Sequence, residues 1–518
     1  MPSSRKFALL AFAVLAAWIA SMANDAPQSM WVHPDRTGKL VYKQTSAGDK
    51  ILDFSYAGYM GGGVALPEVP AKKTVSPSGG DDSASIQAAI DEVSSLPLLN
   101  GVRGAVLLAT GQFHCNSTLK IAASGVVLRG SGSGEKDTVI EMTGEPHLGF
   151  SIEGEEKLTR AGAPVAVADA YVPAGAMSIR VVDASGFKPG DRVQIIRPTT
   201  PAWVHLMGMD MLVRDGKKEI WVGGDLKTER TIVAIRGESV DFDVPLADSY
   251  DAKYLAPPGA TVMKVEQSGE ISQVGLENLR LVAPARSVTL SEKPFNALQA
   301  SGTKDSWIRN LRILDTTEAI TITKTSRRVT IEQVDVTQSL PIVGAAKPAD
   351  FSLNGTQILL DRCTATGNDV FYVAVGAGEQ GPNVVLHGVF HGNGHVQPHQ
   401  RWSTGILIDS SETPDGGIDL MNRGEMGSGH GWTMGWGVAW NNFAKAFLIQ
   451  MPPGSANWSI GNRGEEQTDR MKTYSGPELP MLPAGIIESQ ESPVSPASLY
   501  LAQLGERLGP QAVKNIGY

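Results

Sequence analysis

Cysteine is scarce in this sequence, with two among 518 residues. Two thiols cannot build the dense disulfide framework that holds small exported domains together. Cys115 and Cys363 also lie far apart, in segments with the alternating pattern of strands. We therefore expect two buried free thiols that take no part in the chemistry.

Positive charge is also in short supply. Lysine and arginine number 45 against 54 acidic residues, and loss of Arg5 and Lys6 with an N-terminal signal would lower the net charge from −9 to −11. Nucleic-acid binding needs a basic footprint, so we expect no nucleic-acid partner. An anionic sugar polymer would need a local cluster of basic side chains to offset the charge of the whole protein.

Long apolar segments are confined to the N-terminus. Arg5 and Lys6 precede an apolar run from Phe7 to Ile19, and small residues follow at Ser21 and Ala23. This is the pattern of a secretory signal peptide at residues 1–23. The run is shorter than the roughly 20 residues of a membrane helix, although a retained anchor is the alternative. We expect a secreted or periplasmic protein with no stable membrane insertion after signal removal.

Glycine, by contrast, is abundant at 57 residues, and short strand-like segments follow one another along the chain. One helix precedes them: Ile86, Ala89, Ile90 and Val93 have helical spacing after an acidic turn. A helix that leads directly into short strands indicates a cap on the end of a stack of β-turns.

A loose repeat extends from about residue 271. Segments such as 274–281, 308–313, 329–336, 358–363 and 384–389 alternate apolar and polar residues and recur every 23 to 32 residues. Repeats of this size without intervening helices predict a β-solenoid, in which each coil packs against the next. A β-sandwich would need longer strands and hairpin signals, which are scarce.

The expected fold is therefore all-β, a right-handed parallel β-helix with an N-terminal capping helix and a small β insertion. The insertion is expected where the rhythm breaks and charge increases, and a C-terminal helix is expected from Leu501, Leu504 and Leu508. The expected organisation is a signal peptide at 1–23, a lead-in at 24–75, a β-helix at 76–464 interrupted at about 186–262, and a tail at 465–518.

The handedness comes from a resemblance to a known superfamily. Gly80-Asp81-Asp82-Ser83, the helix pattern from Ile86 to Ile90, Gly111 and the segment Val127-Leu128-Arg129-Gly130 resemble the entry of the pectate-lyase-like superfamily. The resemblance covers most of the mature chain outside the insertion. It implies a right-handed parallel β-helix and action on uronic-acid or other acidic polysaccharides. The superfamily includes lyases, hydrolases, epimerases and non-catalytic surface proteins, so the fold does not settle the function.

The region most favourable for chemistry is 387–464. It holds five of the nine histidines, namely His387, His391, His395, His399 and His430, together with half of the ten tryptophans. The spacing of four among the first four histidines would form a metal stripe on a helix, but the glycines between them and Pro398 exclude that helix. We therefore expect no metal site, although zinc bound through folded loops is the alternative. His387 and His391 are expected at coil edges.

The loop around Gly429-His430-Gly431 is similar to a tripeptide in the active sites of β-helical polygalacturonases. The other motifs of those hydrolases are missing here, as is the aspartate cluster of calcium-dependent pectate lyases. A phosphate-binding loop is excluded because neither a lysine nor a helix follows the glycines. No cofactor is expected, and a calcium requirement stays open.

Three functions remain. The first is a polysaccharide lyase acting by β-elimination, in which Arg401 or Arg423 neutralises the substrate carboxylate and His430 or His399 transfers protons. The second is a glycosidase, a glycoside hydrolase whose carboxylate pair is Asp409 and Glu425, with Asp369 and Asp419 in reserve. The third is a non-catalytic glycan-binding surface solenoid.

The substrate of all three is expected to be a polysaccharide. The residues expected to bind it are Trp402, Trp432, Trp436 and Arg463, because indoles stack on sugar rings and guanidinium groups hold carboxylates. Trp440 and Trp458 each belong to a strand-like run and are expected to pack between coils. A structural alternative applies to the charged residues, since arginine–carboxylate pairs could join neighbouring coils.

Overall fold

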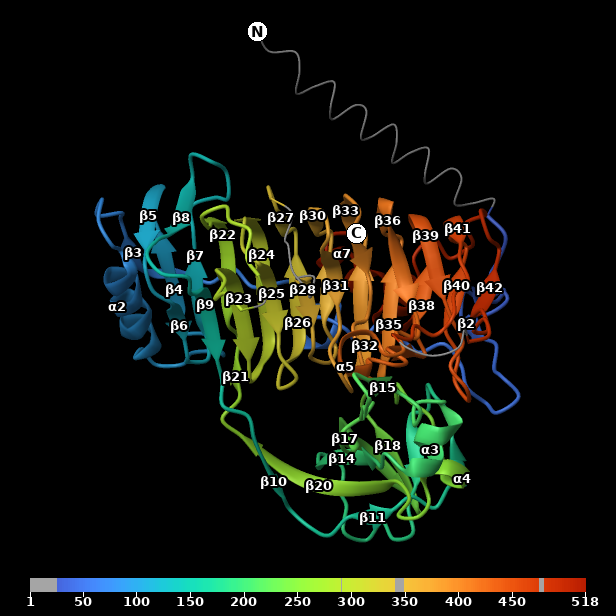
Figure 1. The fold of residues 1–518 in the computed structure, drawn as a ribbon. Coiled ribbons are helices and arrows are strands. Elements are labelled where there is room, and N and C mark those ends of the chain that lie inside the picture. The colour runs from blue at the N-terminus through green and yellow to red at the C-terminus, as the bar shows by residue number, and fades with distance from the viewer. Residues whose placement is uncertain (1–25, 290, 341–348, 475–478) are drawn as a thin grey trace.

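The computed structural model describes residues 26–289, 291–340, 349–474 and 479–518. The chain forms a right-handed parallel β-helix, with a smaller antiparallel domain attached along one side (Figure 1). The expected fold class is thereby confirmed. The expected signal peptide at 1–23 lies outside the described residues, and no helix among the described residues is long and apolar enough to cross a membrane.

Each coil passes through three parallel sheets, which we call A, B and C in the order the chain meets them. Sheet A contains β3 (Ala71–Val75), β4 (Gly104–Leu108), β7 (Val126–Arg129), β21 (Ile271–Ser272), β26 (Arg327–Glu332), β29 (Leu359–Asp361), β32 (Gln380–Leu386), β35 (Ser403–Asp409), β37 (Met434–Gly435), β38 (Val438–Trp440), β40 (Trp458–Ile460) and β42 (Ile486–Glu488). Sheet B contains β5 (Gly111–Cys115), β8 (Thr138–Met142), β27 (Asp335–Thr337), β30 (Thr364–Thr366) and β33 (Val389–His391).

Sheet C contains β6 (Leu119–Ile121), β9 (Leu148–Glu153), β23 (Asn296–Ser301), β25 (Glu318–Ile322), β28 (Ala349–Leu353), β31 (Phe371–Ala374) and β34 (His395–Val396). Some strands bend around a corner and belong to two sheets: β22 (Gly275–Val282) and β24 (Thr303–Leu314) join A to B, while β36 (Glu412–Leu420), β39 (Phe443–Ile449) and β41 (Arg463–Glu466) join B to C.

One residue makes the corner between sheets A and B. In seven coils this residue has a left-handed conformation, with φ between 49° and 58°; the seven are Asn278, Asn310, Gln333, Arg362, His387, Ser410 and Asn441. A single left-handed residue turns the chain sharply without a loop. The corner is therefore short in these seven coils, whereas an early coil has a longer connection there, residues 130–137 between β7 and β8.

Amide side chains form a ladder inside this corner in the late coils. Asn442 donates from Nδ2 to the carbonyl of Ile408 at 2.9 Å, and Asn462 donates to the carbonyl of Ala439 at 2.9 Å. Asn462 Oδ1 also accepts from the backbone N–H of Asn442 at 2.7 Å. Both amides are fully buried, so the ladder satisfies backbone groups that turn inward where the strands end.

The outer face of sheet A is covered by both ends of the described chain. Tryptophans 436, 440 and 458 pack there against the N-terminal segment and against α6 (Leu499–Leu508), as expected for Trp440 and Trp458. The same layer includes β1 (Val32–Pro34), β2 (Leu40–Tyr42), η1 (Tyr59–Gly61) and α7 (Pro510–Asn515). Sheet A is thus enclosed on both sides and offers little surface to a ligand.

The expected capping helix is α2 (Ser83–Ser94), which lies at the N-terminal end of the coils (Figure 1). Ile86, Ala89, Ile90 and Val93 are the residues it buries, apart from Ser83. Both cysteines are buried and free, as expected. The apolar pattern of the sequence therefore identified the helix and its buried face correctly.

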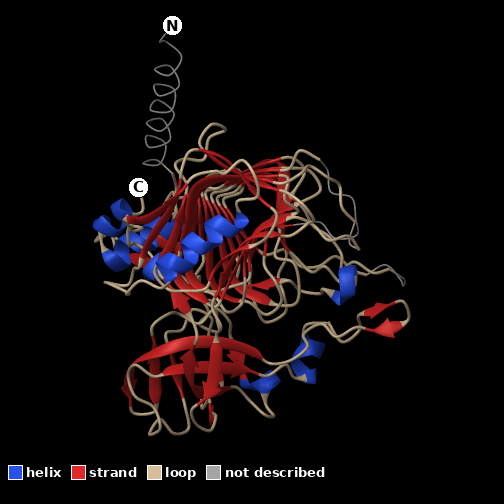
Figure 2. Ribbon diagram, turned by 90° about the vertical axis from the view of Figure 1, so that its left-hand side faces the viewer, coloured by secondary structure: helices blue, strands red, loops and turns tan. Residues whose placement is uncertain are grey.

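The insertion is an antiparallel domain that leaves the solenoid after β9 and returns at β21. Its main sheet contains β10 (Lys157–Arg160), β11 (Val165–Ala166), β13 (Ser178–Arg180), β14 (Arg192–Arg197), β17 (Leu226–Arg236), β18 (Ser239–Phe242) and β20 (Thr261–Ser268). Smaller elements are β12 (Tyr171–Val172), β19 (Tyr250–Asp251), β15 (Val213–Arg214), β16 (Lys217–Lys218), α3 (Pro201–Leu206) and α4 (Ala252–Leu255). It is longer than the expected segment 186–262, and Figure 2 shows its sheet beside the stacked coils.

The amide ladder gives a stability prediction. Replacing Asn462 with alanine leaves buried backbone groups of residues 439 and 442 without their partners, which should lower the free energy of unfolding by about 2 kcal/mol. Urea denaturation of both proteins measures the change. The matched control is Gln511→Ala, an exposed amide on α7 that bonds to the side chain of Asn515, and it should cost less than about 0.5 kcal/mol. Equal losses from the two variants would contradict the proposed role of the ladder.

Candidate functional site

The connections from sheet C to sheet A lie stacked along one edge of the solenoid, and the insertion is the longest of them. The late connections at 397–402 and 421–433 carry most of the residues expected from the sequence. The insertion contacts the second of these loops, because Trp221 donates from its indole N–H to the carbonyls of His430 and Trp432 at 3.1 Å. The candidate site therefore lies where this edge meets the outer face of sheet C.

His395 and Asp419 form a pair on the outer face of sheet C. His395 Nδ1 lies 2.7 Å from Asp419 Oδ2, and the imidazole is 36% exposed while the carboxylate is 7% exposed. Gly417 lies beside the ring on the next strand, where an added Cβ would come within 2.6 Å of Nδ1. A buried carboxylate that fixes one ring nitrogen leaves the other nitrogen facing solvent, which is the arrangement of a general base.

Phe371 joins this pair to a second cluster. It is aligned with His395 on the neighbouring strand, and its ring lies 5.0 Å from that of His399 and 5.6 Å from the guanidinium carbon of Arg423. Arg423 Nη1 donates to the carbonyl of His399 at 2.9 Å and lies 3.1 Å from its Nδ1. Because arginine only donates, this nitrogen of His399 is the acceptor. The rings of His399 and His430 are 4.8 Å apart.

Burial and positive charge keep both imidazoles of this cluster neutral. Burial, followed by the nearby Arg423, lowers the pKa of His399 to about 4. Burial lowers the pKa of His430 to about 3, with further contributions from Arg423, His399 and Arg401. Burial also lowers the pKa of Arg423 to about 10, and Asp419 partly opposes that shift. An anion bound beside these groups would oppose the effect of the arginines on the two imidazoles and would add to the effect of Asp419 on Arg423.

Three buried nitrogen atoms in the cluster have no hydrogen-bond partner: Arg401 Nε, Arg423 Nε and His430 Nδ1. Unsatisfied buried donors are rare in folded proteins because each costs free energy. Arg401 is tied to the same loop through Nη2, which donates to the carbonyl and hydroxyl oxygens of Ser428 at 2.6 and 2.7 Å. Surplus donors and positive charge in one place suit an anionic group such as a carboxylate.

The structure therefore brings together four of the six expected catalytic residues, His399, Arg401, Arg423 and His430. Glu425 lies in the same loop, but both of its oxygens accept from backbone N–H groups, at 3.2 Å from Val213 and 2.7 Å from Tyr474. Glu425 is 4% exposed, so it joins the loop to the insertion. It faces no open surface on which a substrate could lie.

Asp409 lies outside this cluster, and the expectation that it is a catalytic carboxylate is wrong. It is fully buried under the outer layer of sheet A, where Oδ2 accepts from Ser498 Oγ and from the backbone N–H of Tyr500, both at 2.8 Å. These contacts fasten the start of α6. Of the two reserve carboxylates, Asp369 lies at the exposed corner between sheets B and C, and Asp419 is the one that reaches the site.

The expectation that Trp402, Trp432 and Trp436 stack on sugar rings is also wrong, because each is at most 2% exposed. Their indole N–H groups bond to the insertion: Trp402 and Trp436 donate to Asp248, and Trp432 donates to the carbonyl of Met207. They join the insertion to the late coils. Arg463 is exposed on sheet B, with its guanidinium carbon 5.4 Å from the ring of Phe443, away from the edge.

The sequence analysis did not select His395 as a proton acceptor, and it named Asp419 only as a reserve carboxylate. Their spacing could have identified them as neighbours, because they lie 24 residues apart, as do His399 and Arg423. That interval is one coil. Among the described residues, no group of three or more His, Cys, Asp or Glu side chains could hold a metal ion.

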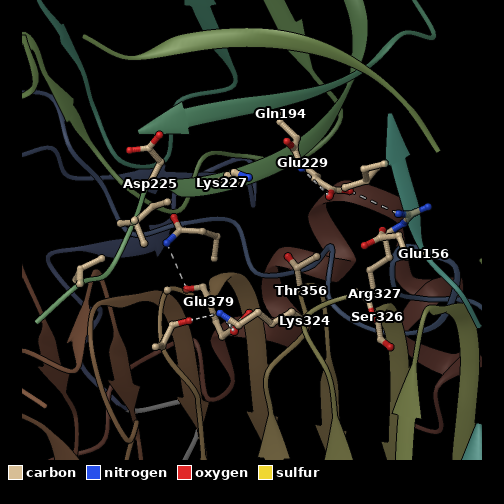
Figure 3. A pocket seen from close by; sticks show the side chains of 18 of the residues that line it. Glu156, Gln194, Asp225, Lys227, Glu229, Lys324, Ser326, Arg327, Thr356 and Glu379 are labelled. Carbon is tan, nitrogen blue, oxygen red and sulfur yellow. Dashed lines mark hydrogen bonds and ion pairs between the residues drawn. The ribbon is translucent and has the colours of Figure 1, made fainter. Parts of the chain in front are cut away.

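A groove of about 520 Å³ lies between connections that follow sheet C and the insertion (Figure 3). Arg401 lines it and so connects it to the cluster described above. The groove also contains Glu156, Glu229 and Glu379, which the sequence analysis did not select. Glu379 lies in a glycine-rich stretch like that around Glu425, whereas nothing in the sequence distinguishes the two glutamates of the insertion.

Comparisons with known proteins identify no family. No protein-family profile matches the chain, and no curated protein matches it. Similar solved structures include the tailspike gp61 of Pseudomonas phage phi297 (11% identity, 80% of this chain, 74% of that chain, TM-score 0.30) and the A-module of mannuronan C-5 epimerase AlgE6 of Azotobacter vinelandii (12%, 80%, 75%, 0.32). Another is the surface adhesin PfbA of Streptococcus pneumoniae (11%, 82%, 80%, 0.32). Likenesses this low say nothing about the activity of this chain.

The pKa of His430 gives a prediction about stability and pH. The folded protein lowers this pKa to about 3, whereas the unfolded chain has the ordinary value near 6.5. The unfolded state therefore binds more protons between these values, so the imidazole costs stability as the pH falls below about 6.5. On going from pH 7.5 to pH 5, the parent should lose on the order of 1–2 kcal/mol more than the His430→Asn variant.

Urea denaturation at the two pH values measures this difference, and contributions from other groups cancel between parent and variant. The control is His391→Asn, which removes an exposed imidazole from sheet B and should lose as much as the parent. A His430→Asn variant with the parent's pH dependence would show that the imidazole is not held neutral.

Proposed function

We propose that the protein is a polysaccharide lyase that cleaves a uronic-acid-containing chain by β-elimination on the outer face of sheet C. The observation that carries the proposal is the partly exposed imidazole of His395, fixed at 2.7 Å by Asp419, whose charge also acts on the buried guanidinium of Arg423. Elimination from a uronate needs a base for the C5 proton and positive charge on the adjacent carboxylate. These residues supply both.

In this proposal Arg423 and Arg401 hold the uronate carboxylate and make the C5 proton more acidic. His395 takes that proton, the C5–H electron pair forms the C4=C5 double bond, and the C4–O4 bond breaks with its electrons passing to O4. The imidazolium then returns the proton to O4 on the same face of the sugar. Asp419 stabilises the imidazolium between the two transfers. The products are a new non-reducing end with a double bond and a chain that ends in a hydroxyl group.

The cluster of two arginines and two neutral imidazoles supports this assignment. The unpartnered nitrogens of Arg401, Arg423 and His430 are enclosed, so the cluster acts on a carboxylate through the positive charge of its two guanidinium groups. Bound anionic charge would also raise the lowered pKa values of His399 and His430 towards their ordinary range. We assign these two imidazoles to substrate positioning, because His395 is the more exposed base.

The two alternatives have less support. A hydrolase needs two carboxyl groups on either side of the scissile bond, and the pair Asp409 and Glu425 is occupied by backbone and hydroxyl partners. A purely binding solenoid would use exposed aromatic rings, yet the late tryptophans are buried. The proposal also includes export by the segment 1–23, because polymeric uronates are substrates outside the cytoplasm.

The test is a spectroscopic assay on acidic polysaccharides such as alginate, polygalacturonate and hyaluronan. We expect ultraviolet absorbance from the unsaturated uronate to grow with at least one of them. His395→Gln should lower kcat/KM about 100-fold or more, because it removes the group that moves the proton. Asp419→Asn should lower it less and shift the pH profile, since Asp419 acts by positioning the imidazole.

The matched control is Arg463→Gln, which removes an exposed guanidinium from sheet B and should leave the activity within about twofold. Arg401→Gln should instead raise KM, because Arg401 binds the carboxylate. New reducing ends without absorbance would contradict elimination and favour hydrolysis. Binding without either signal would contradict catalysis altogether.

A further inference from the structure

The groove beneath the insertion has two walls of different origin. One wall comes from the connections at 323–326 and 375–379 with the start of β26, and the other comes from β10, β14 and β17 of the insertion. Its volume is about 520 Å³, within the range of ligand pockets. The side chains labelled in Figure 3 project into it from both walls.

Charged side chains dominate the lining. The cations are Lys227, Arg230, Lys324, Arg327 and Arg401, and the acids are Glu156, Asp225, Glu229 and Glu379. Several of them pair across the groove or along its floor: Lys324 Nζ lies 3.1 Å from Glu379 Oε1, and Arg327 Nη1 lies 4.0 Å from Glu229 Oε2. The lining therefore holds a slight excess of positive charge in a protein whose overall charge is −9.

We propose that this groove is a second binding site for an anionic sugar chain, and that its affinity increases as the pH falls through neutrality. The proposal rests on the proposed function only for the class of ligand, since the groove shares only Arg401 with the residues assigned to the lyase reaction. Arg401 belongs to both sites, so a chain held in the groove would continue past Arg401 towards His399 and His430.

Lys324 and Glu379 form the pair that responds to a ligand. Glu379 is 6% exposed, and its Oε1 has no hydrogen-bond partner apart from this ion pair. Lys324 is exposed at the mouth of the groove and donates to the carbonyl of Ala377 at 2.5 Å. A substrate carboxylate can take the place of Glu379 as the counter-ion once Glu379 is protonated. The lysine then attracts the polymer without a competing carboxylate.

Two acids in the groove titrate near pH 7, the range in which a substrate carboxylate could replace Glu379 as counter-ion. Burial raises the pKa of Glu379 to about 7, against an opposing effect of Lys324. Burial and the neighbouring Glu229 raise the pKa of Glu156 to about 7 as well. Below this range both groups are neutral, and the groove gains up to two units of positive charge. A bound polyanion raises both pKa values further, so binding near pH 7 should take up protons.

Other charged groups face these acids from every neighbouring element. Besides the groove lining, they are Arg192 on β14, Lys304 on β24, and Glu270 in the turn before β21. Glu229 accepts from Arg192 at 2.5 Å, and Glu270 is paired with both Lys304 and Arg327. Glu229 and Glu270 therefore each have a cation as partner. Glu156, by contrast, bonds only to the neutral Gln267 among the contacts that the structure describes.

The test measures binding of defined oligosaccharides of galacturonate, of mannuronate and of hyaluronan to the full-length protein by calorimetry. The background is His395→Gln, so that no ligand is cleaved. We expect at least one ligand to bind several-fold more tightly at pH 6 than at pH 8, with proton uptake at pH 7 that appears as a dependence on buffer ionisation enthalpy. Lys324→Gln should weaken binding about three- to tenfold.

Glu379→Gln should tighten binding at pH 8 by a similar factor and reduce the difference between pH 6 and pH 8, because the neutral amide imitates the protonated acid. The matched control is Glu412→Gln, an exposed acid on sheet B, which should leave both affinities unchanged. If Lys324→Gln and Glu379→Gln leave the affinity unchanged, the inference is wrong even if the parent cleaves the polymer. Binding that depends on them in a parent without lyase activity would instead refute the proposed function and leave the groove intact.

Discussion

A left-handed residue between sheets A and B sets the shape of seven coils of the molecule. It turns the chain within one or two residues, and the buried amides of Asn442 and Asn462 saturate the backbone immediately inside the corner in the late coils. An early coil shows the alternative, because residues 130–137 form a longer connection between β7 and β8 at the same corner. In the later coils this corner stays short, and the longest connections follow sheet C. The candidate site and the insertion share that edge.

The insertion explains the unusual electrostatics of that edge. By covering the loops 397–402 and 421–433 it removes water from Arg423, His399 and His430, which shifts all three pKa values in the same direction. The three late tryptophans hold it in place through indole N–H bonds and apolar contact rather than through contact with a ligand. Buried positive charge without a counter-ion is costly, so the cluster is stabilised when an anion arrives.

Sequence reasoning recovered the fold better than the site, and particular residues show why. The spacing of Ile86, Ala89, Ile90 and Val93 is local, and it identified α2 with its buried face. The repeat likewise revealed the coils, because each strand carries its own alternation. The start of the insertion was missed, since β10 to β13 are short and antiparallel and follow no repeat.

For the site, sequence proximity was a poor guide and the coil interval would have been a better one. Trp402 and Asp409 lie close to His399 in the sequence, yet one is packed against the insertion and the other lies under α6. His395 and Asp419, by contrast, are one coil apart and in contact. In a solenoid the residues that meet are those separated by one turn, whereas burial by a domain inserted some 200 residues earlier leaves no local trace.

The net negative charge of the protein and a polyanionic ligand are compatible because the two act over different distances. At physiological ionic strength the field of distant surface carboxylates is screened within about 8 Å. A chain lying against Arg401 and Lys324 therefore responds mainly to charges in the groove and the cluster. Among the acids there, Glu156 and Glu379 are in part neutral near pH 7, and Glu229 is held by a cation. Local pairing and partial protonation thus let an acidic protein present a cationic path along one edge of its solenoid.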